Sequence, residues 1–232
     1  MIDDVLINVG PIAYTPPVGG TTFGAWATLA TPPIPLRGLW IYPNNYNGNI
    51  LINLGLGSSP ASIYVENIQN DSQGQAPIWV PMFFPANVPI SFQGIQYNGT
   101  AGFEISATLV GGDISLAHTG MQSLGQSVNN AFYGFQPPAS TAWQQIGSGL
   151  LLPSREFVFG LGSGTTGAYN GCSIGYGPNT TSVTTLIQPS FGDVNAWQYG
   201  YVNFRKKLPS GTLLWLYNND NGNIVVSGYA FY

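Results

Sequence analysis

The sequence predicts an all-β protein built from two tandem jelly-roll-like antiparallel β-sandwich domains that arose by internal duplication. Its 31 glycines and 18 prolines interrupt almost every stretch long enough to test for helical periodicity. Between these breaks lie short runs rich in Val, Ile, Tyr, Phe, Trp and Thr, which are typical of strands. Landmarks of the first half also recur in the same order about 120 residues later, which indicates a tandem duplication.

Three pairs of landmarks anchor the repeat. They are spaced by 117, 120 and 120 residues and comprise Trp26 and Trp143, Gly55 and Gly175, and Pro89 and Pro209. Each tryptophan follows a loop of small residues, each glycine interrupts a strand, and each proline introduces a later strand. The matched positions share no charged residue, so we expect that a scaffold was duplicated, because an inherited active site would leave matching polar chemistry in both copies.

The expected strands follow in the same order in both copies. In the first copy they lie at residues 26–29, 38–42, 50–54, 62–67, 78–83, 90–92 and 103–109. In the second copy they lie at residues 143–146, 156–161, 173–176, 182–187, 198–204, 213–217 and 224–230. Seven or eight short strands in roughly 110 residues favour a sandwich of the jelly-roll type. In residues 103–109 apolar and polar side chains alternate, so Glu104 is expected to point away from the core.

These strands divide the chain into four parts. Residues 23–110 form the first jelly-roll domain and residues 140–232 the second. Residues 1–22 are rich in proline and glycine and lie outside the repeat, so we expect an N-terminal arm that leaves the domain. Residues 111–139 suit an interdomain connection that covers exposed apolar surface. Either of these outer segments could instead be an assembly contact.

The composition indicates a folded protein with an unusually neutral surface. Only 6% of the residues are charged, against a usual share of roughly 25%. The 44% hydrophobic and 13% aromatic content supplies ample apolar surface for a core. The exposed residues are therefore mostly neutral and polar, which suits packing against neighbouring subunits or contact with sugars.

The charge pattern argues against two classes of partner. A net charge of −4 with five Lys and Arg gives no basic groove for nucleic acid. The one basic cluster, Arg205 to Lys207, is expected to guard an exposed hairpin or edge strand. No apolar run is long enough for a transmembrane helix, and the acidic start of the chain lacks the positive charge of a secretory signal. We expect neither nucleic acid nor a membrane as a partner.

The chain offers few groups for catalysis, and we expect no catalytic residue, no metal site and no cofactor. Its single histidine, His118, has no flanking nucleophile, so a solvated or interface position is expected. Its single cysteine, Cys172, is expected to be a small buried hydrophobic residue. Zinc sites need more Cys and His ligands than the chain contains. A pair of carboxylates could cleave a glycoside, and the candidates are Glu66 and Glu104 inside strands of the first copy and their counterparts by location in the second copy, Glu156 and Asp193.

Binding of a sugar is a stronger alternative, because aromatic rings and amide side chains suit the apolar faces and hydroxyl groups of carbohydrates. The candidate aromatic residues, which could equally lie in the core or at subunit interfaces, are Tyr42, Tyr46, Tyr97, Trp197, Tyr199 and Trp215.

The order of strands resembles a class of tailed-bacteriophage and phage-like virion proteins with paired jelly-roll or β-sandwich domains. The resemblance rests on NILINLGLGSSPASIYVENI followed by PMFFPANVPISFQ, and on GCSIGYGPNTTSVTTLI and YVNFRKKLPSGTLLWL in the second copy. In such proteins the proline turn usually reads PAG, whereas here it reads VPIS and LPSG, so only the second copy retains the glycine.

The resemblance implies a non-enzymatic virion component that decorates the capsid or forms a head spike, a fibre or a tail attachment. It implies assembly in the host cytoplasm, other virion proteins as partners, a homo-oligomeric state and contact with host-surface polysaccharide. A low charge and neutral polar surfaces agree with assembly into a symmetric particle. The alternative is a carbohydrate-binding, lectin-like module, and a glycan-cleaving enzyme is a third reading.

Overall fold

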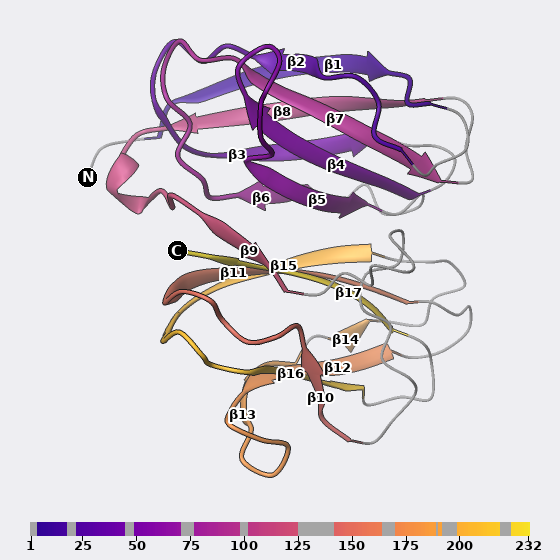
Figure 1. Ribbon diagram of the computed structural model, residues 1–232, viewed down its shortest axis with the longest axis vertical. Helices are drawn as coiled ribbons and strands as arrows, with labels where there is room; N and C mark the ends of the chain where they lie inside the picture. The colour runs from indigo at the N-terminus through magenta and orange to yellow at the C-terminus, as the bar shows by residue number, and fades with distance from the viewer. Residues whose placement is uncertain are drawn as a thin grey trace. The chain divides into compact units, whose positions relative to one another are not determined.

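The computed structural model describes residues 4–17, 22–44, 49–70, 77–97, 102–124, 142–163, 170–188, 190–191, 199–218 and 224–232. The chain divides into two compact units, residues 1–121 with Phe231 and residues 122–230 with Tyr232. Among the described residues, neighbouring strands of the sheets pair antiparallel in both units (Figure 1). The expected all-β class is therefore confirmed.

Unit 1 is a jelly roll of two four-stranded sheets. If its strands are numbered along the chain, the sheets have the orders 1-8-3-6 and 2-7-4-5, which is the jelly-roll arrangement. The first sheet contains β1 (Leu6–Tyr14), β8 (Phe103–Gly111), β3 (Leu36–Asn44) and β6 (Ile78–Val80), and the second contains β2 (Ala27–Ala30), β7 (Ile90–Tyr97), β4 (Asn49–Leu56) and β5 (Val65–Asn70). A 3-10 helix, η1 (Ile114–Leu116), follows β8.

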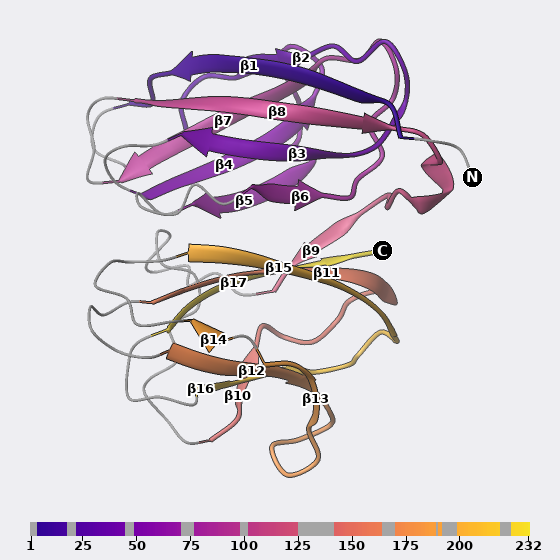
Figure 2. The same cartoon turned by 180° about the vertical axis from the view of Figure 1, so that it is seen from behind.

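Unit 2 repeats this arrangement. Its sheets have the orders β15-β11-β17-β9 and β10-β16-β12-β13, with β14 paired to β12 beside that path (Figure 2). With β14 set aside, the strands again take the orders 1-8-3-6 and 2-7-4-5. The strands are β9 (Met121–Ser123), β10 (Gln144–Ile146), β11 (Ser154–Ser163), β12 (Asn170–Tyr176), β13 (Thr184–Ile187), β14 (Ser190–Phe191), β15 (Tyr199–Leu208), β16 (Leu214–Asn218) and β17 (Ile224–Phe231). Two copies of one topology confirm the internal duplication.

Each unit buries its own apolar core. In β8 the apolar residues from Phe103 to Leu109 are buried and the alternating polar residues are half-buried, so Glu104 points away from the core as expected. In unit 2 the rings of Phe157 and Phe204 stack at 5.3 Å between centroids, and Phe159 stacks on Phe204 at 5.9 Å. Cys172 is fully buried in this core, which confirms its expected role.

Each expected strand overlaps an observed strand, but the first strand of each jelly roll was not expected. Residues 6–14 form β1, which pairs with β8 from Leu6↔Val110 to Tyr14↔Phe103, so this part of the expected arm belongs to unit 1. Pro11 breaks the strand pattern in the sequence and is accommodated because β1 lies at the edge of its sheet, beside a register shift. In the expected interdomain connection, residues 121–123 form β9 of the second jelly roll, and residues 125–141 lie outside the described residues.

Strand pairing gives a residue-by-residue alignment of the two units. Leu56 pairs with Ile90 in unit 1, and Tyr176 pairs with Leu214 in unit 2. The neighbouring hydrogen bonds, from Gly57 N to Pro89 O at 2.7 Å and from Gly177 N to Leu213 O at 3.1 Å, are equivalent as well. Pro89 therefore corresponds to Leu213, and its expected match to Pro209 is wrong by four residues. The other two landmarks hold, because each tryptophan directly precedes the second strand of its jelly roll and each glycine lies in the fourth.

Candidate ligand-binding site

Of the six expected aromatic residues, the structure describes the side chains of Tyr42 and Trp215, which belong to different units. Tyr42 lies on β3 of unit 1 and is 38% exposed, so its ring remains accessible. Trp215 lies in unit 2 and is only 7% exposed, and its Nε1 donates a hydrogen bond to Gly177 O at 2.8 Å. Trp215 is thus part of the interior and does not offer a platform for a sugar. Tyr46 and Trp197 lie outside the described residues, as do the side chains of Tyr97 in β7 and Tyr199 in β15.

The three candidate carboxylates that the structure describes, Glu66, Glu104 and Glu156, lie in three different sheets. Glu66 lies in the sheet of β5 and Glu104 in the opposite sheet of unit 1, where Asn44 Nδ2 donates a hydrogen bond to Glu104 Oε2 at 3.3 Å. Glu156 is buried in unit 2, and Arg205 Nε donates to its Oε2 at 3.1 Å. Asp193 lies outside the described residues.

Of the two positions expected for His118, solvated or at an interface, the structure excludes the solvated one. His118 is 7% exposed and forms a parallel bridge with Met82. Its backbone N–H donates to Pro81 O at 2.9 Å, and its carbonyl accepts from Phe83 N at 2.8 Å. The histidine is therefore fixed inside unit 1 by the segment that follows β6. Across the described part of the chain, no three His, Cys, Asp or Glu side chains gather in a group that could hold a metal ion.

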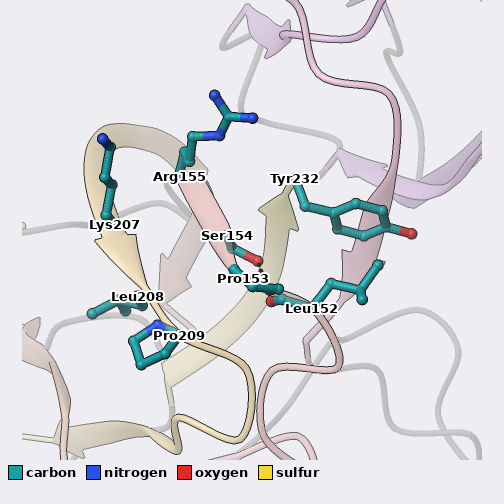
Figure 3. Close-up of a pocket in the computed structure, with 8 residues that line it drawn as sticks. All are labelled: Leu152, Pro153, Ser154, Arg155, Lys207, Leu208, Pro209 and Tyr232. Atoms are coloured by element: carbon teal, nitrogen blue, oxygen red, sulfur yellow. Dashed lines mark hydrogen bonds between the residues drawn. The ribbon is translucent and has the colours of Figure 1, made fainter.

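A hollow with a volume of about 630 Å³ lies where β11 begins and β15 ends (Figure 3). The Ser154 hydroxyl donates to Leu152 O at 3.2 Å and shapes the loop that enters β11. The residues that line the hollow are Leu152, Pro153, Ser154, Arg155, Lys207, Leu208, Pro209 and Tyr232. They combine two cations, one phenol ring and an apolar floor. Figure 3 shows the side chains of Arg155 and Lys207 extending in the same direction from the two paired strands.

A β-bulge sets the direction of the two cations. Ser154 pairs with Leu208 and Glu156 pairs with Arg205, so two residues of β15 stand opposite Arg155 alone. Such bulges redirect side chains. Lys207 lines the hollow, whereas the ammonium group of Lys206 lies 5.8 Å from the centroid of the Tyr176 ring.

The basic residues of the chain concentrate at this place. Four of the five Lys and Arg residues, namely Arg155, Arg205, Lys206 and Lys207, belong to β11 and β15. Since β15 ends the order of its sheet, the expected position of this basic cluster on an edge strand is confirmed. Arg205 is paired with Glu156, but no described residue forms an ion pair with Arg155 or Lys207. The hollow is therefore a local cationic site on a chain of net charge −4.

Arg155 has an equivalent in unit 1, which the sequence comparison missed. The Leu36–Phe84 bridge of unit 1 is equivalent to the Ser154–Leu208 pair of unit 2. The residue that follows Leu36 and the residue that follows Ser154 are both arginines. Arg37 and Arg155 are both the second residue of the third strand of their jelly roll. The expectation that the copies share no charged residue is wrong, and a repeated Pro-x-Arg at 35–37 and 153–155 was the signal for it.

The two equivalent arginines differ in their surroundings. Arg37 binds the Asp4 carboxylate with two hydrogen bonds, from Nε to Oδ1 at 2.9 Å and from Nη2 to Oδ2 at 2.5 Å. These bonds hold the pKa of Asp4 below its ordinary value. The guanidinium of Arg37 also lies 5.4 Å from the centroid of the Trp79 ring. Arg155 is exposed, and Asn203 takes the place that Trp79 has in unit 1.

A second hollow of about 400 Å³ lies elsewhere in unit 2. Its lining is formed by Tyr176, Gly177, Pro178, Ser182, Thr184 and residues 209–213. It contains no charged side chain, so it lacks the anchoring groups of the first hollow.

Comparison with known proteins gives no family. No family model and no curated protein matches the chain. Among solved structures, an allantoicase from Saccharomyces cerevisiae shares 11% identity over 95% of this chain and 83% of that chain, with a TM-score of 0.24. Another allantoicase shares 12% identity over 97% of this chain and 90% of that chain, also with a TM-score of 0.24. A likeness at this level carries no argument about activity. In the part of the chain that the structure describes, no helix is long and apolar enough to cross a membrane.

Proposed function

We propose that the protein is a non-enzymatic structural component of a tailed-phage virion, which decorates the capsid or forms a spike, fibre or tail attachment and contacts the host surface. The observation that carries this proposal is the tandem pair of jelly rolls with one strand order. Jelly rolls recur in viral capsid proteins and lectins, and duplication adds a second scaffold without adding a catalytic site. The resemblance of the strand order to phage virion proteins supports the same conclusion.

Surface composition supports assembly with other copies or other virion proteins. With 6% charged residues, the surface lacks the dense charge that keeps most monomers apart. Adjacent leucines are exposed in the loop before β11, Leu151 by 71% and Leu152 by 46%. An exposed apolar pair of this kind is suited to burial in a subunit contact. The proposed location is the virion, after assembly in the host cytoplasm.

The test is the mass of the purified chain in solution, measured by light scattering with and without host polysaccharide. We expect a stable homo-oligomer whose mass does not depend on sugar. Leu151→Asp is expected to lower the mass, whereas Thr180→Asp, which places the same charge at an exposed polar turn, is expected to leave it unchanged. A monodisperse monomer that binds polysaccharide would instead support the carbohydrate-binding module. Appearance of new reducing ends in the polysaccharide would contradict the non-enzymatic part of the proposal.

A further inference from the structure

We propose that the hollow between the start of β11 and the end of β15 binds the carboxylate group of an acidic saccharide, with Arg155 as its bidentate partner and Lys207 as a second cation. The inference rests on the proposed function insofar as it gives the host-contacting surface a site and a ligand class.

Unit 1 shows that an arginine at this place in the fold can hold a carboxylate. Arg37, the equivalent of Arg155, donates from Nε and Nη2 to the two oxygens of Asp4. This fork geometry is the one in which guanidinium groups recognise carboxylates most specifically. In unit 1 the ligand is therefore internal. In unit 2 the same arginine lacks an acidic partner among the described residues, and an external carboxylate can take the place that Asp4 takes in unit 1.

Lys207 supplies a second cation beside Arg155, which unit 1 lacks at the equivalent position. The bulge of β15 brings it to the hollow beside Arg155, so two cations face the same space. Phe83 occupies the equivalent position of unit 1, because Phe84 corresponds to Leu208. Arg155, Lys206 and Lys207, which form no ion pair with a described residue, also attract anions to this end of the sheet, although the whole chain is acidic.

The size and floor of the hollow favour a sugar over an isolated acidic side chain. A volume of about 630 Å³ lies within the range of small-molecule sites and exceeds what one aspartate or glutamate would fill. Pro153, Leu208, Pro209 and the ring of Tyr232 supply apolar contacts, which suit the C–H faces of a pyranose ring. A uronic acid carries such a face and a carboxylate on one ring.

The test is binding of the full chain to a panel of oligosaccharides, measured by titration calorimetry. The panel contains oligomers of galacturonic, glucuronic and mannuronic acid, and the same oligomers after reduction of their carboxyl groups to hydroxymethyl groups. We expect at least one acidic oligomer to bind, with roughly tenfold or greater loss of affinity on reduction. We also expect the affinity to fall with added salt, because the cations are exposed.

Three variants assign the binding to the hollow. Arg155→Gln is expected to weaken the binding of the acidic oligomer roughly tenfold to a hundredfold, and Lys207→Gln to weaken it less. Arg155→Lys keeps the charge without the fork and should restore only part of the affinity. Lys206→Gln is the matched control, since it removes one charge from the next residue, which lies against Tyr176 outside the hollow. Thermal unfolding of each variant verifies that unit 2 is folded.

Several results would overturn the inference. It fails if none of the acidic oligomers binds, if the reduced oligomers bind equally well, or if Lys206→Gln weakens binding as much as Lys207→Gln does. It also fails if Arg155→Gln abolishes self-association without affecting sugar binding, because the carboxylate would then come from a second copy of the chain. Light scattering on the same samples separates this inference from the proposed function. An oligomer that ignores acidic sugars refutes the site alone, and a monomer that binds them refutes the virion role alone.

Discussion

We expect Gly38→Ala to destabilise unit 1 by about 1 to 3 kcal/mol, which is the usual cost of forcing an extra methyl group into a packed site. A Cβ atom at this position would lie 2.4 Å from Cη2 and 2.7 Å from Cζ2 of the Trp79 ring. It would also lie 2.7 Å from the backbone oxygen of Val80, which cannot move without disturbing the pairing of β3 and β6. Both neighbours must therefore shift.

The second unit explains why the cost depends on Trp79. Glu156 is the equivalent of Gly38 and carries a full side chain, and Asn203 stands in place of the tryptophan. A smaller residue at position 79 should relieve the two contacts with the ring, whereas the contact with Val80 O remains. Trp79→Ala alone is expected to cost about 3 kcal/mol or more, because it empties a nearly buried site. The double variant should lose less unfolding free energy than the sum of the two single losses, by at least about 0.5 kcal/mol.

The free energy of unfolding is measured for the wild type, Gly38→Ala, Trp79→Ala and the double variant. Urea-induced unfolding is followed by circular dichroism, and thermal unfolding is measured by calorimetry. Gly57→Ala combined with Trp79→Ala is the control pair, because a Cβ at Gly57 would have no heavy atom within 4 Å and the two effects should simply add. A Gly38→Ala chain as stable as the wild type would refute the close packing. Additive effects of Gly38→Ala and Trp79→Ala would refute the idea that the ring is what excludes a side chain there.

Three further predictions concern single groups. Burial raises the pKa of the Cys172 thiol to about 12, so the thiol of the unfolded chain loses its proton at lower pH than the thiol of the folded chain. The stability that this thiol contributes is complete below about pH 9 and should fall by about 1.4 kcal/mol per pH unit towards pH 12. Denaturant unfolding of Cys172→Ala should lack this contribution and keep only the fall that the pKa values of Tyr14 and Tyr64, raised by burial, cause at higher pH. Tyr14→Phe removes the hydrogen bond that the hydroxyl donates to Ala25 O at 2.8 Å and the one that it accepts from Gly94 N at 3.3 Å. The variant should lose at least about 1 kcal/mol of stability by denaturant unfolding, whereas no change would show that β1 does not depend on these bonds. Arg205→Met leaves the buried carboxylate of Glu156 without this donor and should cost about 1 to 3 kcal/mol by thermal unfolding, more than the same change at an unpaired cation of β15.

The regular part of the fold could be predicted because strands and turns leave local signals. The alternation of residues 103–109 and the glycine-broken strands around Gly55 and Gly175 identified the elements from which both sandwiches are built. β1 left no such signal, since Gly10 and Pro11 interrupt it. It is a strand because it pairs with β8, almost 100 residues away, and pairing at that distance is not visible in a local pattern.

The aromatic candidates show a second reason why a site is harder to predict than a fold. Trp215 lies between Leu214 and Leu216, and all three are buried, so the usual alternation of buried and exposed residues fails at this strand. The Gly177 carbonyl accepts the hydrogen bond from the indole N–H of Trp215, so the turn at Gly177 lies against the ring that would have to be exposed to bind a sugar. Which aromatic ring is accessible depends on such coverage by distant segments. The basic residues of the hollow can be read from the sequence. However, only the pairing of β11 with β15 shows that Arg155 and Lys207 line the same hollow.

Arg37 and Arg155 occupy equivalent positions of the two jelly rolls but have different surroundings. Arg37 is neutralised by Asp4 and covered by Trp79, so in unit 1 it serves the structure by joining the segment before β1 to β3. The equivalent Arg155 has neither partner among the described residues and remains exposed. Arg155 therefore does not stabilise unit 2 through such contacts with the described residues, and its guanidinium is free to bind a carboxylate from outside the chain, as the further inference proposes. Under the proposed function, the arginine of unit 1 would stabilise the fold by binding Asp4, whereas the equivalent arginine of unit 2 would bind a ligand from the host surface.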